Sequence, residues 1–538
     1  MTIATEHENL LHFIGPENAV WSTANAGEAI PGTVTPLNWS LFGTVCEQSI
    51  RYGFQQIGVL SKRDVRVPRD NKERTLGIFY GHSAIKVDFL CEMASRVPGM
   101  SGEAMAMQML GSAPPGLPTG RQVWRYPFIA IRLPLAGLTL KRRLDKVVRK
   151  TSLDWWRTGV RRAPMLSLID ARAQMREAYQ HFFDAQMIQT VSVVAAIQPA
   201  FDTLNKLIKK TGLGDLRGDL MAGYGSHVES AMVYAMWAIS RERMTLDEFL
   251  HEYGFHGPRE GEISGRVWRE DPAPLQRMIN GYRRLGDDDD PSRLEAGKVK
   301  RREAAEQKLL QALPALQRPL ARLVMRAAKH FVPMRGIGKM TFLAALDVLR
   351  ATARRLGELL LQEGSIDAAD DVFYLTYEEL IADLSPDARR VIAERKALFE
   401  RYSKFTLPRW WQGQPVPISS AETHEDSGET TLRGIGASAG VIEGIVEVVT
   451  NPDFADVPDD CILVAPTTDP SWVPLMYLSK ALVVDIGGEL SHAAVVAREL
   501  GIPCVVGTNH GSRSLKSGDY CRVDGNAGTV EILRRATI

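Results

Sequence analysis

The sequence predicts a multidomain protein in which a mostly α-helical domain precedes a small β/β/α domain. The chain has 538 residues, which is more than one ordinary domain holds. Apolar residues recur at three- and four-residue spacings over most of residues 76–401, a pattern typical of helices packed on a core. After Phe405 the chain alternates glycine-marked turns with β-branched runs. We therefore expect two folded domains joined by a linker.

The helical domain is predicted to cover residues 1–405. Residues 20–43 are rich in Gly, Pro, Thr and Asn, which indicates extended chain and turns leading into a helix. The clearest helical pattern lies in residues 322–364, which end in a glycine stop. Residues 370–380, "DDVFYLTYEEL", predict a strand-like or turn segment before a further helix.

The change in composition after residue 405 predicts a flexible linker over residues 406–431. This stretch holds prolines, serines and acids without a regular apolar period. Residues 432–538 then contain the runs "GIVEVVT", "CILVAPTT", "ALVVDIGG", "IPCVVGT" and "YCRVDGNAGTVEIL", which predict strands. One helix, Ser491 to Leu500, is expected between two of them. A module of about 110 residues is within the size range of an independent domain.

Charge and cysteine content exclude several classes of partner. The formal net charge of +1 gives no reason to expect nucleic acid or an anionic membrane as partner. The N-terminus has no signal-peptide pattern, and no apolar stretch is long enough to cross a bilayer. We therefore expect a cytoplasmic protein without a bound metal ion of its own. The five cysteines are scattered without a C-x-x-C pair, which favours a reducing compartment: Cys46, Cys91, Cys461, Cys504 and Cys521.

One histidine, His492, opens the predicted helix in "GGELSHAAVVAREL", with Ser491 as the expected N-cap. A helix N-terminus favours an anion and disfavours a protonated imidazole. His492 is thus a candidate neutral nucleophile whose phosphorylated form the helix end would stabilise. Gly487 and Gly488 would let another surface approach closely. The alternative is a structural histidine near a helix start.

The segment around His492 resembles the phosphohistidine swivelling domain of the phosphoenolpyruvate (PEP)-utilising enzymes, which include PEP synthase, pyruvate phosphate dikinase, enzyme I of sugar transport and rifampicin phosphotransferase. The resemblance covers residues 432–533, with "LRGIGASAGVIEGIVEVV", "ILVAPTTDPSWVPLM" and "VDGNAGTVEIL". It implies that His492 carries a phosphoryl group, with Gly487, Gly488 and Ser491 as the cofactor-binding positions. It also implies a domain that swings between a nucleotide site and an acceptor site. Glu489 could orient the imidazole, although a helix-capping role is favoured.

Residues 1–405 resemble the helical acceptor domain of rifampicin phosphotransferase. The segments that carry this resemblance are "WSTANAGEAIPGTVTPL", "GIFYGHSAIKVDFLCEMASRVPG", "YGFHGPREGEISGRVWREDP" and "DDVFYLTYEEL". Full-length members also carry an ATP-grasp domain, yet the sequence contains no P-loop and no glycine-rich loop followed by lysine. The resemblance therefore favours a split enzyme similar to phenylphosphate synthase and the 4-methylphenyl (p-cresol) phosphate synthase of aromatic degradation.

In such an enzyme, ATP and Mg²⁺ would bind to a separate ATP-grasp subunit of a hetero-oligomer. The resemblance implies that His492 carries phosphoryl from ATP to a phenolic hydroxyl, such as that of phenol or p-cresol. The products would be an aryl phosphate, AMP and phosphate. One alternative is a subunit of a rifampicin-type antibiotic phosphotransferase, and another is a PEP synthase-like protein. A third is a non-catalytic regulator, although the intact "GGELSHAA" argues against it.

Three further residues are catalytic candidates. Arg335 and Lys339, in "PMRGIGKM", are four apart and share one face if the segment is helical. Two fixed cations would offset the charge of a migrating phosphoryl group, and they resemble an Arg/Lys pair of the rifampicin enzymes; the alternative is two solvated charges. His256, in "YGFHGPREGE", is a candidate general base. The family segment usually has Gly before this histidine, whereas here Phe255 precedes it, and a loop held by ion pairs is the alternative.

Overall fold

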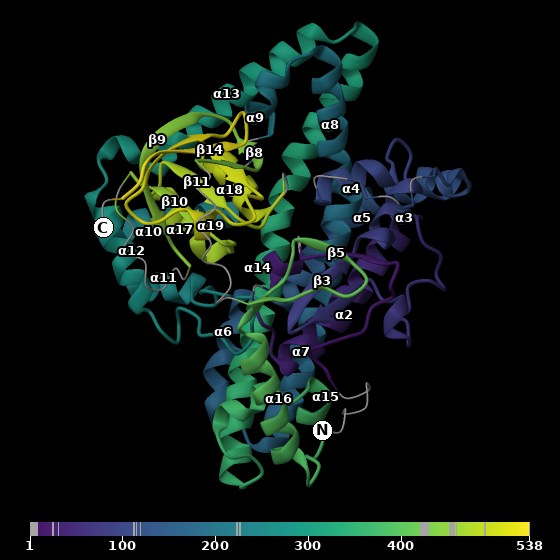
Figure 1. Cartoon of the computed structure of the whole chain (residues 1–538), viewed down its shortest axis with the longest axis vertical. Helices are drawn as coiled ribbons and strands as arrows, with labels where there is room; N and C mark the ends of the chain where they lie inside the picture. The colour runs from purple at the N-terminus through teal and green to yellow at the C-terminus, as the bar shows by residue number, and fades with distance from the viewer. Residues whose placement is uncertain are drawn as a thin grey trace. The chain divides into compact units, whose positions relative to one another are not determined.

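Helices fill most of the chain up to residue 402, and strands dominate from residue 431 onward (Figure 1). The predicted fold class, a helical part followed by a small β/β/α domain, is confirmed. Glu489 lies outside the residues that the structure describes. This computed structural model describes residues 9–23, 26–30, 32–110, 113–114, 116–118, 120–221, 224, 227–419, 430–450, 458, 460–488 and 491–536.

The chain forms two compact units, and each is assembled from separate stretches of sequence. Unit 1 comprises Met1–Val191, Arg259–Gly265 and Thr341–His424. Unit 2 comprises Ser192–Pro258, Arg266–Met340 and Glu425–Ile538. Packing therefore groups part of the predicted helical domain with the C-terminal strands. The domain boundaries at residues 405 and 432, which follow the change in sequence pattern, stay predictions.

Unit 1 combines helices with a small antiparallel sheet of order β2-β3-β1-β5. Of the two alternatives for residues 370–380, the structure has the turn: a 3₁₀ helix, Ala369–Tyr374, precedes α15, which begins at a reciprocal capping box of Thr376 and Glu379. Its elements are β1 (Val20–Ser22), α1 (Ala26–Ala29), α2 (Pro36–Gln56), β2 (Leu76–Phe79), β3 (His82–Lys86), α3 (Val87–Ser95), α4 (Gly102–Leu110), α5 (Tyr126–Lys150), α6 (Leu153–Arg162), α7 (Leu168–Ser192), α15 (Tyr377–Leu380), α16 (Ala388–Tyr402), β4 (Phe405–Thr406), β5 (Trp410–Gln412) and β6 (Ile418–Ser419).

The first half of the expected linker differs from a free tether. Strand β5 pairs with β1 in the sheet of unit 1, and β6 pairs with β4. The side chain of Trp411 is buried beside Phe79, with the two ring centroids 5.2 Å apart. Burial of a large aromatic ring holds this stretch of chain in place. Residues 420–429, where the rest of the linker was expected, lie outside the described residues.

Unit 2 contains a mixed eight-stranded sheet of order β7-β14-β13-β9-β10-β11-β12-β8. The inner strands β9, β10, β11 and β12 run parallel, and their neighbours pair antiparallel. The β-branched runs noted in the sequence form these strands. The strands are β7 (Thr431–Arg433), β8 (Ile435–Ser438), β9 (Val441–Val448), β10 (Ile462–Ala465), β11 (Ala481–Val484), β12 (Cys504–Val506), β13 (Tyr520–Asp524) and β14 (Thr529–Arg534).

The helices of unit 2 fall into those of the sheet domain and those that precede it in sequence. Helix α14 is long, and its residues up to Met340 belong to this unit. The helices are α8 (Gln198–Thr211), α9 (Arg217–Met221), α10 (His227–Ser240), α11 (Leu246–Tyr253), α12 (Ala273–Arg284), α13 (Pro291–Ala312), α14 (Arg318–Gln362), α17 (Val473–Tyr477), α18 (His492–Leu500) and α19 (Gly511–Ser514).

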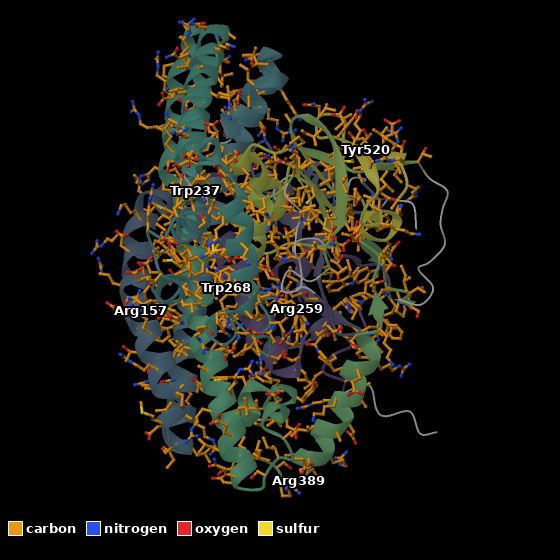
Figure 2. All side chains as sticks on the ribbon, turned by 90° about the vertical axis from the view of Figure 1, so that its left-hand side faces the viewer. Arg157, Trp237, Arg259, Trp268, Arg389 and Tyr520 are labelled. Atoms are coloured by element: carbon orange, nitrogen blue, oxygen red, sulfur yellow. The ribbon has the colours of Figure 1, made fainter. Side chains whose placement is uncertain are left out.

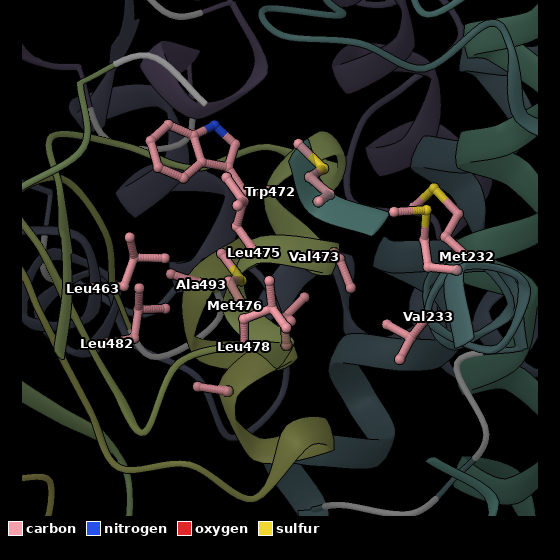
Figure 3. Close-up of a cluster of buried hydrophobic side chains, with 14 of the residues drawn as sticks. Met232, Val233, Leu463, Trp472, Val473, Leu475, Met476, Leu478, Leu482 and Ala493 are labelled. Carbon is pink, nitrogen blue, oxygen red and sulfur yellow. The ribbon is translucent and has the colours of Figure 1, made fainter. Parts of the chain in front are cut away.

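One continuous apolar core joins the C-terminal sheet domain to α10 and α12. In Figure 3, Leu475 and Leu478 of the sheet domain lie between its strands and the helix that carries Met232 and Val233. Trp237 and Trp268, labelled in Figure 2, belong to the same core. Apolar packing of this extent holds the sheet domain against these helices.

No helix in the part of the chain that the structure describes combines the length and hydropathy needed to span a membrane.

Candidate active site

The loop that carries His492 is built by strand β11 and helix α18. Strand β11 ends at Val484, and α18 begins at His492 with Ser491 as its N-cap. The Ser491 hydroxyl accepts a hydrogen bond from the Ala494 N–H at 3.3 Å, which confirms the expected cap. The Asp485 carboxylate accepts from the Thr508 hydroxyl at 2.8 Å. These two bonds fix the loop at both ends.

The imidazole of His492 is buried, with 7% of the residue exposed. Its Nδ1 lies 3.2 Å from Oγ1 of Thr468, which follows strand β10 and is itself 3% exposed. Thr468 is thus placed to orient the ring. A hydroxyl that accepts from Nδ1–H leaves the lone pair on Nε2, and this is the tautomer that a carrier at Nε2 requires.

Two positively charged residues of unit 2 lower the pKa of this imidazole. Burial lowers the pKa of His492 well below its usual value, and the charges of Lys339 and Arg335 lower it further. Both residues lie on α14, four apart, so they share a helix face as predicted. The structure thus brings together His492, Arg335 and Lys339, with the histidine neutral at pH 7.

His256 is placed differently. It is 2% exposed, and its ring lies against Phe255, with the ring centroids 4.4 Å apart. Its backbone carbonyl accepts from the Trp268 N–H at 2.8 Å. The groups that shift the pKa of His492 are burial, Lys339 and Arg335, and His256 is not among them. Its role as a general base stays a prediction.

The acidic residues that follow His256 in sequence belong to unit 1 and hold a loop. The Glu262 carboxylate accepts from the Thr35 hydroxyl at 2.7 Å and from the Thr35 N–H at 3.1 Å. It also accepts from the hydroxyl of Ser264 at 3.0 Å. The guanidinium of Arg350 donates to the backbone carbonyls of Glu260 and Glu262. These contacts hold the loop through hydrogen bonds, and the alternative of a loop held by ion pairs stays a prediction.

The glycines before His492 pack inside their own domain. A Cβ at Gly487 would lie 3.0 Å from the Ser491 hydroxyl oxygen and 3.3 Å from Cβ of Val506. The absence of a side chain at Gly487 therefore leaves room for the N-cap. Gly488 is partly exposed. Whether these positions and Ser491 contact a cofactor stays a prediction.

Comparison with known proteins identifies the segments around this site. Residues 457–528 match the family described as "PEP-utilising enzyme, mobile domain", and this range includes His492 and Thr468. Residues 242–336 match the "Rifampicin phosphotransferase fourth domain", which includes His256 and Arg335. The C-terminal sheet domain belongs to the mobile domains of the PEP-utilising enzymes. The suspected relationship to this family is thereby confirmed.

Curated relatives match the chain at 30% to 32% identity over about 300 aligned residues. Rifampicin phosphotransferase of Bacillus cereus is 30% identical over 300 residues, covering 54% of this chain and 34% of that protein. The Bacillus subtilis rifampicin phosphotransferase is 32% identical over 303 residues, covering 54% and 35%. An uncharacterized protein of Mycobacterium tuberculosis is 32% identical over 284 residues, covering 53% and 31%. The chain thus spans about a third of the length of the curated relatives it matches.

The Mg²⁺ expected with ATP would be held largely by phosphate oxygens and water, with one or two carboxylates. Among the described residues, no three His, Cys, Asp or Glu side chains are grouped to hold a metal ion.

Thr468 is the functional candidate of the mobile domain that the sequence analysis missed. It ends the run "CILVAPTT", which predicts a strand, and it precedes Asp469 at the start of the turn "DPSW". Asp469 does cap that turn, since its carboxylate accepts from the Ser471 N–H at 2.9 Å. Only the folded loop shows that Thr468 meets His492, which lies 24 residues further along the chain.

The lowered pKa of His492 predicts a specific dependence of stability on pH. Between the folded and unfolded pKa values the unfolded chain binds one more proton, so stability falls as the pH drops below about 6.5. The expected loss is about 1.4 kcal/mol per pH unit until the folded pKa is reached. His492→Gln should remove this loss, as measured by urea unfolding at pH 7.5 and 5.5. Equal losses in the two proteins would contradict the assignment, because His12, His82 and His181, whose pKa values burial also lowers, are common to both.

Proposed function

We propose that this chain is the phosphoryl-carrying and phosphoryl-accepting part of an ATP-dependent phosphotransferase, with His492 as the carrier. The observation that carries the proposal is a neutral, oriented imidazole beside two cations, in a segment matched by the mobile domain of the PEP-utilising enzymes. ATP would be bound by a separate ATP-grasp chain or domain together with Mg²⁺.

The atoms of the proposed reaction balance with ATP, water and the acceptor as the only reactants. Overall, ATP, water and an acceptor hydroxyl give AMP, inorganic phosphate and a phosphate monoester. In the second half-reaction the acceptor oxygen forms a bond to phosphorus while the bond from phosphorus to Nε2 of His492 breaks. The electron pair returns to the imidazole, and the hydroxyl proton passes to a general base, the role predicted for His256.

Arg335 and Lys339 would act at the phosphoryl group itself. A phosphoryl in transit carries negative charge on its equatorial oxygens, and fixed cations stabilise that charge in a water-poor site. The same cations keep the resting imidazole neutral. The same two residues would thereby favour the neutral, nucleophilic form of His492 and also the transfer of its phosphoryl group.

For the acceptor we favour a hydroxyl of a rifamycin, since relatives at 30% and 32% identity are named rifampicin phosphotransferases. The second candidate is a simple phenol such as phenol or p-cresol, which rests on the resemblance to the aryl phosphate synthases. A PEP synthase-like reaction would instead use pyruvate.

An acceptor panel separates these candidates. The protein is phosphorylated on histidine with phosphoramidate, freed of reagent, and mixed with rifampicin, phenol, p-cresol or pyruvate. Loss of phosphohistidine and gain of product are followed by ³¹P NMR. We expect rapid transfer to rifampicin. Transfer only to a phenol would establish the second candidate, and transfer only to pyruvate would establish the third. Transfer to none of the four would overturn all three.

A further inference from the structure

Helix α5 of unit 1 carries an apolar stripe on its outward face. The five side chains that we call the α5 stripe are 50% to 83% exposed although all are large and apolar. Four of them follow the three- and four-residue spacing of a coiled-coil seam, and the first extends the seam into the preceding 3₁₀ turn. The α5 stripe consists of Trp124, Phe128, Ile131, Leu135 and Leu138.

The opposite face of α5 already supplies the contacts that the fold needs. Leu140 and Leu144 are 0% and 2% exposed, and Ile129 is 2% exposed. Within unit 1 the Arg125 guanidinium lies over the Trp124 ring at 4.1 Å and over the Phe128 ring at 5.7 Å, and most of the stripe surface stays exposed. Beyond it, α5 (labelled in Figure 1) becomes basic, with five exposed cations: Lys141, Arg142, Lys146, Arg149 and Lys150.

We propose that α5 pairs antiparallel with α5 of a second copy of this chain. A fully covered aromatic side chain buries about 150–250 Å², so the five partly exposed side chains present roughly 500–600 Å². Two copies together would bury roughly 1,000–1,200 Å², which reaches the size of specific interfaces. Contiguous apolar patches beyond a few hundred Å² mark such interfaces on soluble proteins.

Charge selects the antiparallel arrangement. A parallel pair would bring the two basic ends together, and like charges at this density repel. In an antiparallel pair centred on Ile131, the two copies of Lys146 would be about 45 Å apart at 1.5 Å per residue, well beyond the screening length. Ile131 would lie near the two-fold axis and so close to its own copy.

Sedimentation equilibrium and cross-linking test the proposal. At about 50 μM, above the micromolar Kd of weak interfaces of this size, the wild type should be dimeric, and Ile131→Glu with Leu135→Glu should be monomeric. Both residues are exposed, so the double variant should keep its circular dichroism spectrum. A monomeric wild type would overturn the proposal, as would a dimer that the double variant leaves intact.

Cysteine variants test the direction of pairing. In a Cys46→Ser background, a short bismaleimide should join two chains through Ile131→Cys and fail to do so through Lys146→Cys, which lies on the same helix beyond the stripe. Linkage through Lys146→Cys alone would overturn the antiparallel arrangement. A wild type that stays monomeric and sediments with vesicles of anionic phospholipid would assign the stripe to a membrane surface instead.

Discussion

Replacing Arg335 and Lys339 together by methionine is expected to slow phosphoryl transfer from His492 to its acceptor by at least about a thousandfold. Loss of one group that stabilises developing charge costs about a hundredfold to a thousandfold in kcat, and here two are removed. Methionine keeps much of the aliphatic bulk, so packing along α14 is largely retained. The measurement is the rate at which isolated phosphohistidine protein loses its phosphoryl group to rifampicin in a rapid quench.

A matched control is available on the same helix. Arg322 of α14 is exposed, and its charge does not enter the electrostatics of His492. Arg322→Met should therefore transfer at the wild-type rate. If the double variant stays within tenfold of wild type, the two cations serve only to hold the imidazole neutral, and their proposed role in transfer is wrong.

The second large effect concerns the docking of the mobile domain. Gly281 on α12 faces Leu478, and a Cβ at position 281 would lie 2.6 Å from Cδ1 of that leucine. Gly281→Leu should therefore act as a wedge. Overpacking costs about 1–3 kcal/mol, which shifts the ratio of docked to undocked domain about 5- to 150-fold.

Undocking should change two rates in opposite directions. His492 is 7% exposed in the docked state, so the wedge should speed its phosphorylation by phosphoramidate. Transfer to the acceptor should slow, because Arg335 and Lys339 lie on α14, outside the mobile domain. Both are measured by phosphohistidine content over time. Gly297→Leu is the control, since a Cβ there meets only the end of the Arg301 side chain, at 3.6 Å. A wedge that slows both rates would indicate that docking is rigid and that the domain does not travel.

The mobile domain is firmly packed against α10 and α12 in the docked conformation. The core that it shares with α10 and α12 includes Trp472, Leu475 and Met476, each at most 4% exposed. A domain that carries a phosphoryl group can make such a contact only if the docked conformation is one of two that it adopts. In the proposed mechanism, the cations beside His492 would make this docked conformation the one from which the phosphoryl group passes to the acceptor. Loading from ATP would then require the domain to leave it.

The sequence predicted the mobile domain well because its signals are local. The glycine turns, the β-branched runs and the Ser491 cap each act over a few residues, and the strands and α18 form where these signals lie. The Arg335–Lys339 pair could also be predicted, since a four-residue spacing on a helix fixes a shared face.

Other features depend on contacts between distant segments. Strand β5 forms within the expected linker because the Trp411 side chain packs against Phe79, which lies more than 300 residues earlier in the chain. The grouping of α10 and α12 with the mobile domain likewise depends on shape complementarity that no local period encodes. Thr468 reaches His492 only through the pairing of β10 with β11.

The carrier role of His492 is tested most directly by a chase of the loaded protein. Phosphoramidate-treated wild type and His492→Asn are digested under alkaline conditions, phosphohistidine is located by mass spectrometry, and the intact loaded protein is chased with the acceptor found in the panel. The account predicts a phosphoryl group on His492 that moves to the acceptor in equal amount, and none on the variant. A variant that still loads and transfers, or a phosphoryl group on His492 that never leaves it, would contradict the account.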